Sequence, residues 1–393
     1  MKSIKILSVS YRNLPLYNDG KLSFDLTAFN RVVDPQQVFP LQRHLYTQKI
    51  EAIIGINASG KTSSLKLLYL AFAIVLSNVS LNEGPVYGRE FLQDGVELTV
   101  LFAAGNKCYE LTSVFGRKVE DKTKLPVLFF REEILKEKSL ASVSSKRNLF
   151  DFTGTDVNIT RRSGLPKEVH AVLRDDDSIA ITVTKDSTTS LHQLISFTNM
   201  NVYLSQGVTP IEVLHVFDPM LDELKMESNG EELTYTVRFA NQERPMVVHS
   251  PFGLDNIISS GTIKGQMMMM LIKDTLRTGG YLLVDEIENH MNKELIRMIT
   301  EIFKNPEINR QGACLIFTTH YTEILDFIDR KDDIYVARRR KEQPRKLELL
   351  NYAHLVNRND VKKSEVILSN YLGGTAPSYE AIRDLEDYLC RAE

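Results

Sequence analysis

Apolar runs alternate with helical patterns over the second half of the chain. Residues 281–284 and 314–318 are apolar runs that predict buried strands, and residues 293–303 between them predict a helix. A similar run at 52–54 precedes a helical pattern over 63–76. Strands that alternate with helices are typical of a parallel sheet with crossover helices. We therefore expect an α/β fold.

Shorter alternating segments occupy the first 130 residues. Residues 5–9 and 21–26 predict extended segments, and residues 96–103 and 107–115 predict a hairpin. A further strand is expected at 125–130. These segments predict an antiparallel β-layer beside a mixed β-sheet core.

The pattern is less regular between residues 131 and 225, which we expect to be a partly helical insertion. Short helices are predicted at 132–138, 167–173 and 218–225. Charged groups in this region, such as the three aspartates at 175–177, usually form a solvated face. Strands at 233–239 and 244–249 and a helix at 266–276 follow. We therefore expect the chain to have four parts, residues 1–130, 131–225, 226–346 and 347–393.

A glycine-rich stretch, Gly55–Thr62, fits the pattern G-x-x-x-x-G-K-[ST] between a predicted strand and a predicted helix. In this context the backbone N–H groups and the helix N-terminus face phosphate oxygens. Lys61 would reach the β- and γ-phosphates, and the Thr62 hydroxyl would bind Mg²⁺. ATP and Mg²⁺ are therefore the expected ligands; a chance glycine turn is the alternative. The residues expected to contact the nucleotide are Gly55, Asn57, Ala58, Ser59, Gly60, Lys61, Thr62 and Ser63.

Two carboxylates and a histidine follow the later strands. Asp285 and Glu286 end the run at 281–284, and His320 follows the run at 314–319. Asp285 could hold Mg²⁺, and Glu286, which points to the other side, could act as general base or orient a water. His320 could hydrogen-bond the γ-phosphate. A surface Asp-Glu pair and a surface histidine are the alternatives.

A serine-rich segment opens the helix that contains residues 266–276. Ser259, Ser260 and Gly261 offer hydroxyls and backbone N–H groups to an anion. If the glycine loop, the carboxylates and the histidine already enclose the nucleotide, these residues cannot easily reach it within the same chain. We therefore expect them to complete the site of a second subunit, which predicts a homo-oligomer.

Together these segments resemble the ABC-type ATPases, in particular the AAA_15 and OLD-like prokaryotic group of the RloA/AbiLi/AriA type found in phage-defence loci. The resemblance implies two ATPase heads that sandwich two ATP molecules, with the serine segment acting in trans. It also implies control of a separate effector, for example a nuclease. The stretch at 289–292 departs from the family pattern, so no residue is assigned to the D-loop that the family has there. The matching segments are 55–62, 258–262, 282–288, 305–320 and 361–377.

Charge and composition limit where the chain could contact nucleic acid and where the protein is located. The net charge is -3, so any DNA or RNA contact must come from a local patch. The basic hairpin, Arg338 to Lys341 with Arg345 and Lys346, is such a patch, and an exposed turn is the alternative. Three separated cysteines, no secretion signal and no membrane-length apolar run predict a cytoplasmic protein.

The C-terminal part carries an apolar stripe at Ile382, Leu385, Tyr388 and Leu389 on a helix expected at 378–389. The stripe could pack on its own ATPase head or on a partner. The sequence thus predicts an ATP-hydrolysing subunit of an anti-phage system. A DNA-clamping repair or chromosome-maintenance ATPase and, less favoured, the nucleotide-binding subunit of a transporter remain alternatives.

Overall fold

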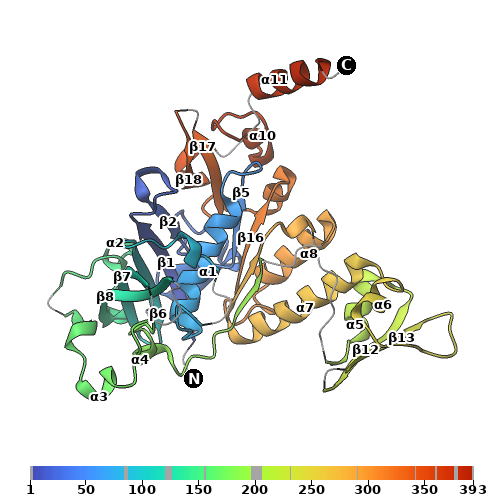
Figure 1. The fold of residues 1–393 in the computed structure, drawn as a ribbon, viewed down its shortest axis with the longest axis horizontal. Coiled ribbons are helices and arrows are strands. Elements are labelled where there is room, and N and C mark those ends of the chain that lie inside the picture. The colour runs from blue at the N-terminus through green and yellow to red at the C-terminus, as the bar shows by residue number, and fades with distance from the viewer. Residues whose placement is uncertain are drawn as a thin grey trace.

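The part of the chain that the structure describes has a mixed α/β fold with four sheets, and Figure 1 shows how they are arranged. The structure is a computed structural model that describes residues 3–83, 87–119, 126–154, 156–195, 206–230, 232–289, 291–340, 342–358, 361–375 and 379–391. Among these residues, no helix is long and apolar enough to cross a membrane.

The central sheet has the strand order β10-β15-β16-β5-β17-β18. Neighbouring strands from β10 to β17 are parallel, and β18 is antiparallel to β17. The parallel sheet expected from the alternating pattern is therefore confirmed. Its strands are β5 (Ile50–Ile54), β10 (Leu191–Leu194), β15 (Tyr281–Val284), β16 (Cys314–Thr319), β17 (Ile334–Arg340) and β18 (Gln343–Asn351).

Both faces of this sheet are buried, each in a different core, and successive side chains of a strand point alternately into the two cores. Ile53 and Leu283 belong to a core shared with α1 (Lys61–Leu76), whereas Ala52 and Leu282 belong to a second core. The second core contains α7 (Ser260–Thr278) and α8 (Lys293–Lys304). Helix α1 is buried almost all round because it lies between the central sheet and a second, antiparallel sheet.

The antiparallel sheet has the order β2-β1-β6-β7-β8-β9, and it confirms the antiparallel β-layer expected from the first 130 residues. The prediction of a helix at 132–138 is wrong, since these residues belong to strand β8, which pairs with β7 over its whole length. The strands are β1 (Ile4–Arg12), β2 (Leu22–Asp25), β6 (Glu97–Ala104), β7 (Lys107–Val119), β8 (Pro126–Ser139) and β9 (Asn158–Arg161).

A smaller unit lies beside the start of α7, at the right of Figure 1, and has its own apolar core. The prediction of a helix at 218–225 is wrong, because strand β12 begins at Leu221 and the helix α5 precedes it. The unit contains β11 (Gly207–Val208), β12 (Leu221–Asn229), β13 (Glu232–Phe239), β14 (Met246–Val248), α5 (Ile211–Phe217) and α6 (Pro251–Asp255).

Short elements connect these parts. The helix predicted at 167–173 is present as one turn, α3. These elements are β3 (Val38–Gln42), β4 (Leu45–Gln48), α2 (Lys146–Leu149), α3 (Lys167–His170), α4 (Ile181–Thr184), α9 (Tyr352–Leu355) and α10 (Lys363–Leu368). The division of the chain into four parts stays a prediction.

The last helix, α11 (Tyr379–Cys390), projects from the rest of the molecule (Figure 1). Its apolar stripe is exposed, with Leu385 56% and Tyr388 68% accessible, so packing of the stripe on the rest of the chain is not observed. Ser378, the expected first residue of this helix, lies outside the described residues.

Candidate functional site

The glycine loop joins the carboxyl end of β5 to the start of α1. Gly60 has φ 97°, a conformation that favours glycine, and a Cβ there would lie 2.5 Å from a methyl group of Leu347. A Cβ on Gly55 would lie 2.3 Å from the carbonyl oxygen of Ala337. Both glycines are therefore required by close packing as well as by the turn. The first N–H groups of α1, which have no partner within the helix, open onto this loop.

Lys61 curls back over the loop. Its Nζ donates to the carbonyl oxygens of Gly55 (2.9 Å) and Ile56 (3.1 Å) and lies 3.1 Å from Nδ1 of His320. Burial lowers the pKa of Lys61 to about 8, although the carboxylates of Glu286 and Asp285 act in the opposite direction. The ammonium group is thus held at the mouth of the loop, among groups that an anion could replace.

Thr62, in the first turn of α1, contacts Asp285, which follows β15. The Thr62 hydroxyl donates to Oδ2 of Asp285 at 2.8 Å, and the Thr318 hydroxyl donates to Oδ1 at 2.6 Å. Burial raises the pKa of Asp285, and these two hydrogen bonds oppose that shift. A hydroxyl and a carboxylate are oxygen ligands of the kind that Mg²⁺ takes together with phosphate oxygens. Within the described part of the chain, no cluster of three or more His, Cys, Asp or Glu side chains could hold a metal.

Glu286 follows Asp285 in a left-handed backbone conformation, with φ 48°. Such a conformation costs a residue with a side chain about 1–3 kcal/mol and persists only where its surroundings hold it. The Glu286 N–H donates to the Thr318 hydroxyl at 2.7 Å, and Asn289 Nδ2 donates to Oε2 at 2.5 Å. These contacts hold the carboxylate of Glu286, and its Oε1 lies 3.2 Å from Nε2 of His320.

His320 bridges the lysine and the carboxylate. Its Nδ1 faces Lys61 Nζ, and its Nε2 lies 3.2 Å from Oε1 of Glu286. A charged lysine can only donate, so Nδ1 accepts and Nε2 carries the proton donated to Glu286. The backbone N–H of His320 donates to Oε1 of Glu288 at 2.6 Å, which fixes the start of the segment. The ring is therefore oriented from both sides.

These residues meet because β15, β16 and β5 are neighbours in one parallel sheet, so their carboxyl ends share an edge. A cavity of about 520 Å³ lies there. Glu286 and His320 lie at one end of it, and Leu16, Arg339 and Leu347 also contribute to its wall. The residues that line it are Leu16, Asn57, Ala58, Ser59, Gly60, Lys61, Thr62, Ser63, Glu286, His320, Arg339 and Leu347.

The serine segment lies elsewhere. None of Ser259, Ser260 and Gly261 belongs to the described lining of this cavity. Ser259 caps α7, with its Oγ accepting from the N–H of Thr262 at 3.1 Å, and Ser260 and Gly261 are exposed. The segment borders the smaller unit through Ile258 and Ile263, which are buried in its core. The exposed N-terminus of α7, a helix of 19 residues, thus lies outside the described lining of the chain's own cavity.

The sequence did not single out three residues that shape the site. Thr318 joins Asp285 to Glu286, Glu288 fixes His320, and Asn289 holds the Glu286 carboxylate. Thr318 carried a signal, because a polar residue at the end of a buried strand is rarely there for packing. The other two contacts depend on the turn after β15, which the sequence pattern does not specify.

The basic hairpin is not a ridge of free charges. Arg338 Nε (3.0 Å) and Arg340 Nε (2.9 Å) both pair with the carboxylate of Glu348, and Arg338 is buried. Arg339 instead points to the glycine loop, where its Nε donates to the carbonyl oxygen of Ala58 at 2.8 Å. Two cations of the hairpin, Arg338 and Arg340, are therefore paired within the chain, and a DNA or RNA contact at the hairpin stays a prediction. Lys341 lies outside the described residues.

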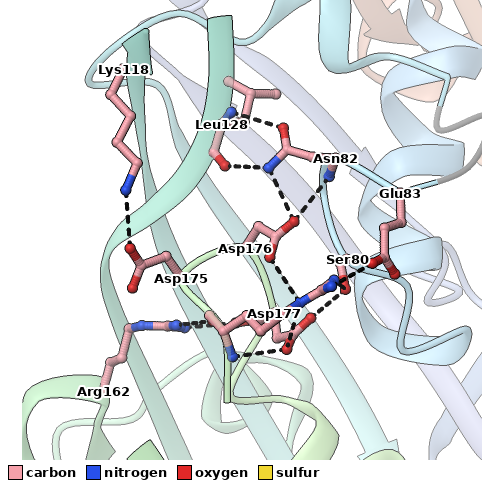
Figure 2. A network of polar contacts seen from close by, with 10 residues as sticks. Ser80, Asn82, Glu83, Lys118, Leu128, Arg162, Asp175, Asp176 and Asp177 are labelled. Atoms are coloured by element: carbon pink, nitrogen blue, oxygen red, sulfur yellow. Dashed lines mark hydrogen bonds and ion pairs between the residues drawn. The ribbon is translucent and has the colours of Figure 1, made fainter. Parts of the chain in front are cut away.

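The three aspartates at 175–177 are engaged within the molecule (Figure 2). Asp175 pairs with Lys118 of β7 at 3.1 Å. Asp176 accepts from the side chain of Asn82 at 3.0 Å, in the loop that follows α1. These contacts tie that loop to the antiparallel sheet. No observation favours a binding role for the cluster.

No protein-family model matches the chain, and a search of the curated proteins gives no match. The function is therefore inferred from the geometry of the site.

Proposed function

We propose that this chain binds and hydrolyses Mg·ATP at the glycine loop and is an ATPase head of the ABC type. The observation that carries the proposal is the chain of contacts from Lys61 through His320 to Glu286, beside the Thr62–Asp285 pair. A phosphate-binding cation, a metal-binding pair and a candidate base lie at one edge of a parallel sheet. This arrangement is what in-line attack on a terminal phosphate requires.

In this proposal the loop N–H groups and Lys61 hold the phosphates. A triphosphate would replace the carbonyl groups of Gly55 and Ile56 as the partner of Lys61 Nζ. When bound, Mg²⁺ supplies positive charge beside the β- and γ-phosphate oxygens. Thr62 and Asp285 are the residues that would hold it.

Glu286 then orients the attacking water and accepts its proton. His320 keeps the carboxylate in position by donating to Oε1, and its other face points to Lys61, next to the expected γ-phosphate. Lys61 contacts His320, and His320 contacts Glu286, so movement of any one of these side chains would displace the others.

The oligomeric part of the proposal rests on the exposed serine segment. Ser260 and Gly261 lie outside the chain's own cavity, on a helix N-terminus that favours anions. A second copy, placed head to tail, would set this N-terminus against the γ-phosphate. The site would then be complete only in the assembly.

The cellular part of the proposal rests on the resemblance to phage-defence ATPases. A separate effector, such as a nuclease, would be held and released according to nucleotide state in the cytoplasm. The exposed stripe on α11 is the surface that we assign to that effector.

The test of the catalytic part is steady-state ATP hydrolysis by purified protein. Lys61→Ala should abolish productive binding, and Glu286→Gln should keep binding while hydrolysis falls about 100- to 10,000-fold. Glu307→Gln, an exposed carboxylate outside the cavity, is the matched control and should hydrolyse at the wild-type rate. Wild-type turnover by Glu286→Gln would contradict the proposal.

A further inference from the structure

The cavity at the glycine loop has a second end, on the side of β5 where β17 and β18 lie. Glu286 and His320 follow β15 and β16, which lie on the other side of β5. Leu16, Arg339 and Leu347 form it, and we call these three residues the base-side end. Leu16 lies in the turn after β1, whereas Arg339 and Leu347 come from the hairpin of β17 and β18. Segments more than 300 residues apart in sequence therefore meet at this end.

Arg339 is held in place by carbonyl groups on both sides. Its Nε donates to Ala58 of the glycine loop at 2.8 Å, and its Nη1 donates to Pro344 of the hairpin at 2.9 Å. Because the guanidinium is planar, two fixed donors also fix the direction of its face. Leu347 packs against Gly60 and is 1% exposed. The base-side end thus exposes one cation, Arg339, and the half-buried Leu16, and the buried Leu347 packs beneath the glycine loop.

The orientation of a bound nucleotide follows from the other end. The terminal phosphate belongs at Glu286 and His320, and the loop N–H groups hold the phosphates before it. The rest of the nucleotide then extends toward the base-side end. We propose that the nucleobase lies there, with its ring face on the Arg339 guanidinium and its edge against Leu16 and Leu347. This inference rests on the proposed function, because it requires a nucleoside triphosphate in the loop.

Such a surface recognises the ring face of a base and not its hydrogen-bonding edge. A guanidinium stacks on any aromatic base, and leucine side chains add contact area without donors or acceptors. The carboxamide in the described lining belongs to Asn57, which lies toward His320, because both residues also line the neighbouring cavity beside α10. The substrate class is therefore nucleoside triphosphates without selection by the hydrogen-bonding edge of the base, so ATP and GTP should bind about equally.

The alternative role of Arg339 is to contact a phosphate directly. Inorganic triphosphate separates the two roles because it has the phosphates and no base. Titration calorimetry would compare Mg·ATP, Mg·GTP and Mg·triphosphate, all in the Glu286→Gln background to prevent turnover. The variants are Arg339→Ala, Arg339→Lys and Arg345→Ala; Arg345 is exposed on the same hairpin and does not line the cavity.

Arg339→Ala should weaken ATP and GTP binding about tenfold and leave triphosphate binding within about twofold, which also shows that the loop is intact. Arg339→Lys should recover only part of the loss, because lysine keeps the charge and lacks the plane. Arg345→Ala should bind all three ligands as the parent does. An equal loss for triphosphate, no loss for ATP, or a preference of more than about tenfold for one purine would overturn the inference. Failure of the proposed function looks different: the parent would bind neither ATP nor triphosphate.

Discussion

His320 contacts both Lys61 and Glu286, so three side chains from three strand ends behave as one unit. Glu286 is also held in a left-handed conformation by Thr318 and Asn289. A residue kept in an unfavourable conformation by several neighbours is typical of a functional site. The sequence named all three members of the unit, because each follows an apolar run or a glycine motif. It did not name the residues that hold them.

A double-mutant cycle tests whether the unit acts as one. His320→Ala and Glu286→Gln should each lower kcat strongly, and the double variant should be little worse than Glu286→Gln alone. The reason is that a misplaced carboxylate and a missing one are equivalent for the reaction. Steady-state hydrolysis of the four proteins gives the cycle. Additive losses would show that the two side chains act independently.

Lys5 gives a pH prediction of a different kind. Its Nζ donates to the carbonyl oxygens of Gly279 (2.7 Å), Gln311 (2.6 Å) and Gly312 (2.7 Å), and burial lowers its pKa from 10.5 to about 7. Between these pH values the unfolded chain keeps a proton that the folded protein loses. The unfolded state then binds more protons, so this group makes the free energy of unfolding rise with pH, by at most about 1.4 kcal/mol per unit.

Urea unfolding of wild type and Lys5→Met at pH 7, 8 and 9 measures this contribution. The wild-type free energy should gain relative to the variant as the pH rises. Other titrating groups are common to both proteins and cancel in the difference. Parallel pH curves would contradict the assignment.

At the scale of elements, the sequence predicts the strands and the helix that are fully buried. It does not predict strands whose assignment depends on contacts with other segments. Strands β5, β15 and β16 and helix α1 are mainly apolar, so the hydrophobic pattern alone identifies them. The strand predicted at 125–130 continues through 132–138, where the sequence predicts a helix; this part of β8 carries the buried Glu133. That carboxylate is buried against Ser113, Arg162 and Ser178, which are distant in sequence. A pattern of nearby residues cannot reveal such partners.

Strand β12 was misassigned for a similar reason. Its residues pair with β13 across a turn at Gly230, which has φ 66°. Residues 218–225 taken alone fit a helix as well as a strand, and the pairing with β13 decides between them. Tertiary pairing overrides local preference in such segments.

The element most separable from the site is α11. Removal of residues 376–393 should leave folding and ATP hydrolysis intact, because its apolar side chains are exposed and none lines the cavity. The cut belongs after Thr375, which is buried and bonds to Ile367 (2.8 Å) and Asn370 (2.9 Å). Thermal unfolding and hydrolysis rates would be compared with wild type.

The same truncation tests the effector surface. Co-purification with the product of the neighbouring gene should be lost, and Leu385→Glu should reproduce the loss. Glu386→Lys, on the same helix outside the stripe, is the control and should retain the partner. If the folded truncation still captures the partner, docking occurs elsewhere.

At the scale of the whole molecule, the glycine loop and the serine segment belong to different parts of the chain. The loop lies at an edge of the central sheet, and the segment begins α7 beside the smaller unit (Figure 1). In the proposed assembly, a single chain would supply half of each of two sites. Head-to-tail pairing of two copies would complete both, in agreement with the closed symmetry that most homo-oligomers adopt.

The most direct test is complementation between two inactive variants, Lys61→Ala and Ser260→Arg. Each alone lacks one half of every site. Random mixing places an intact loop opposite an intact serine segment in one of the two sites of each mixed dimer, so activity should return to about a quarter of wild type. Subunit exchange would be shown by co-purification of differently tagged variants. An inactive mixture despite demonstrated mixed oligomers would contradict the account.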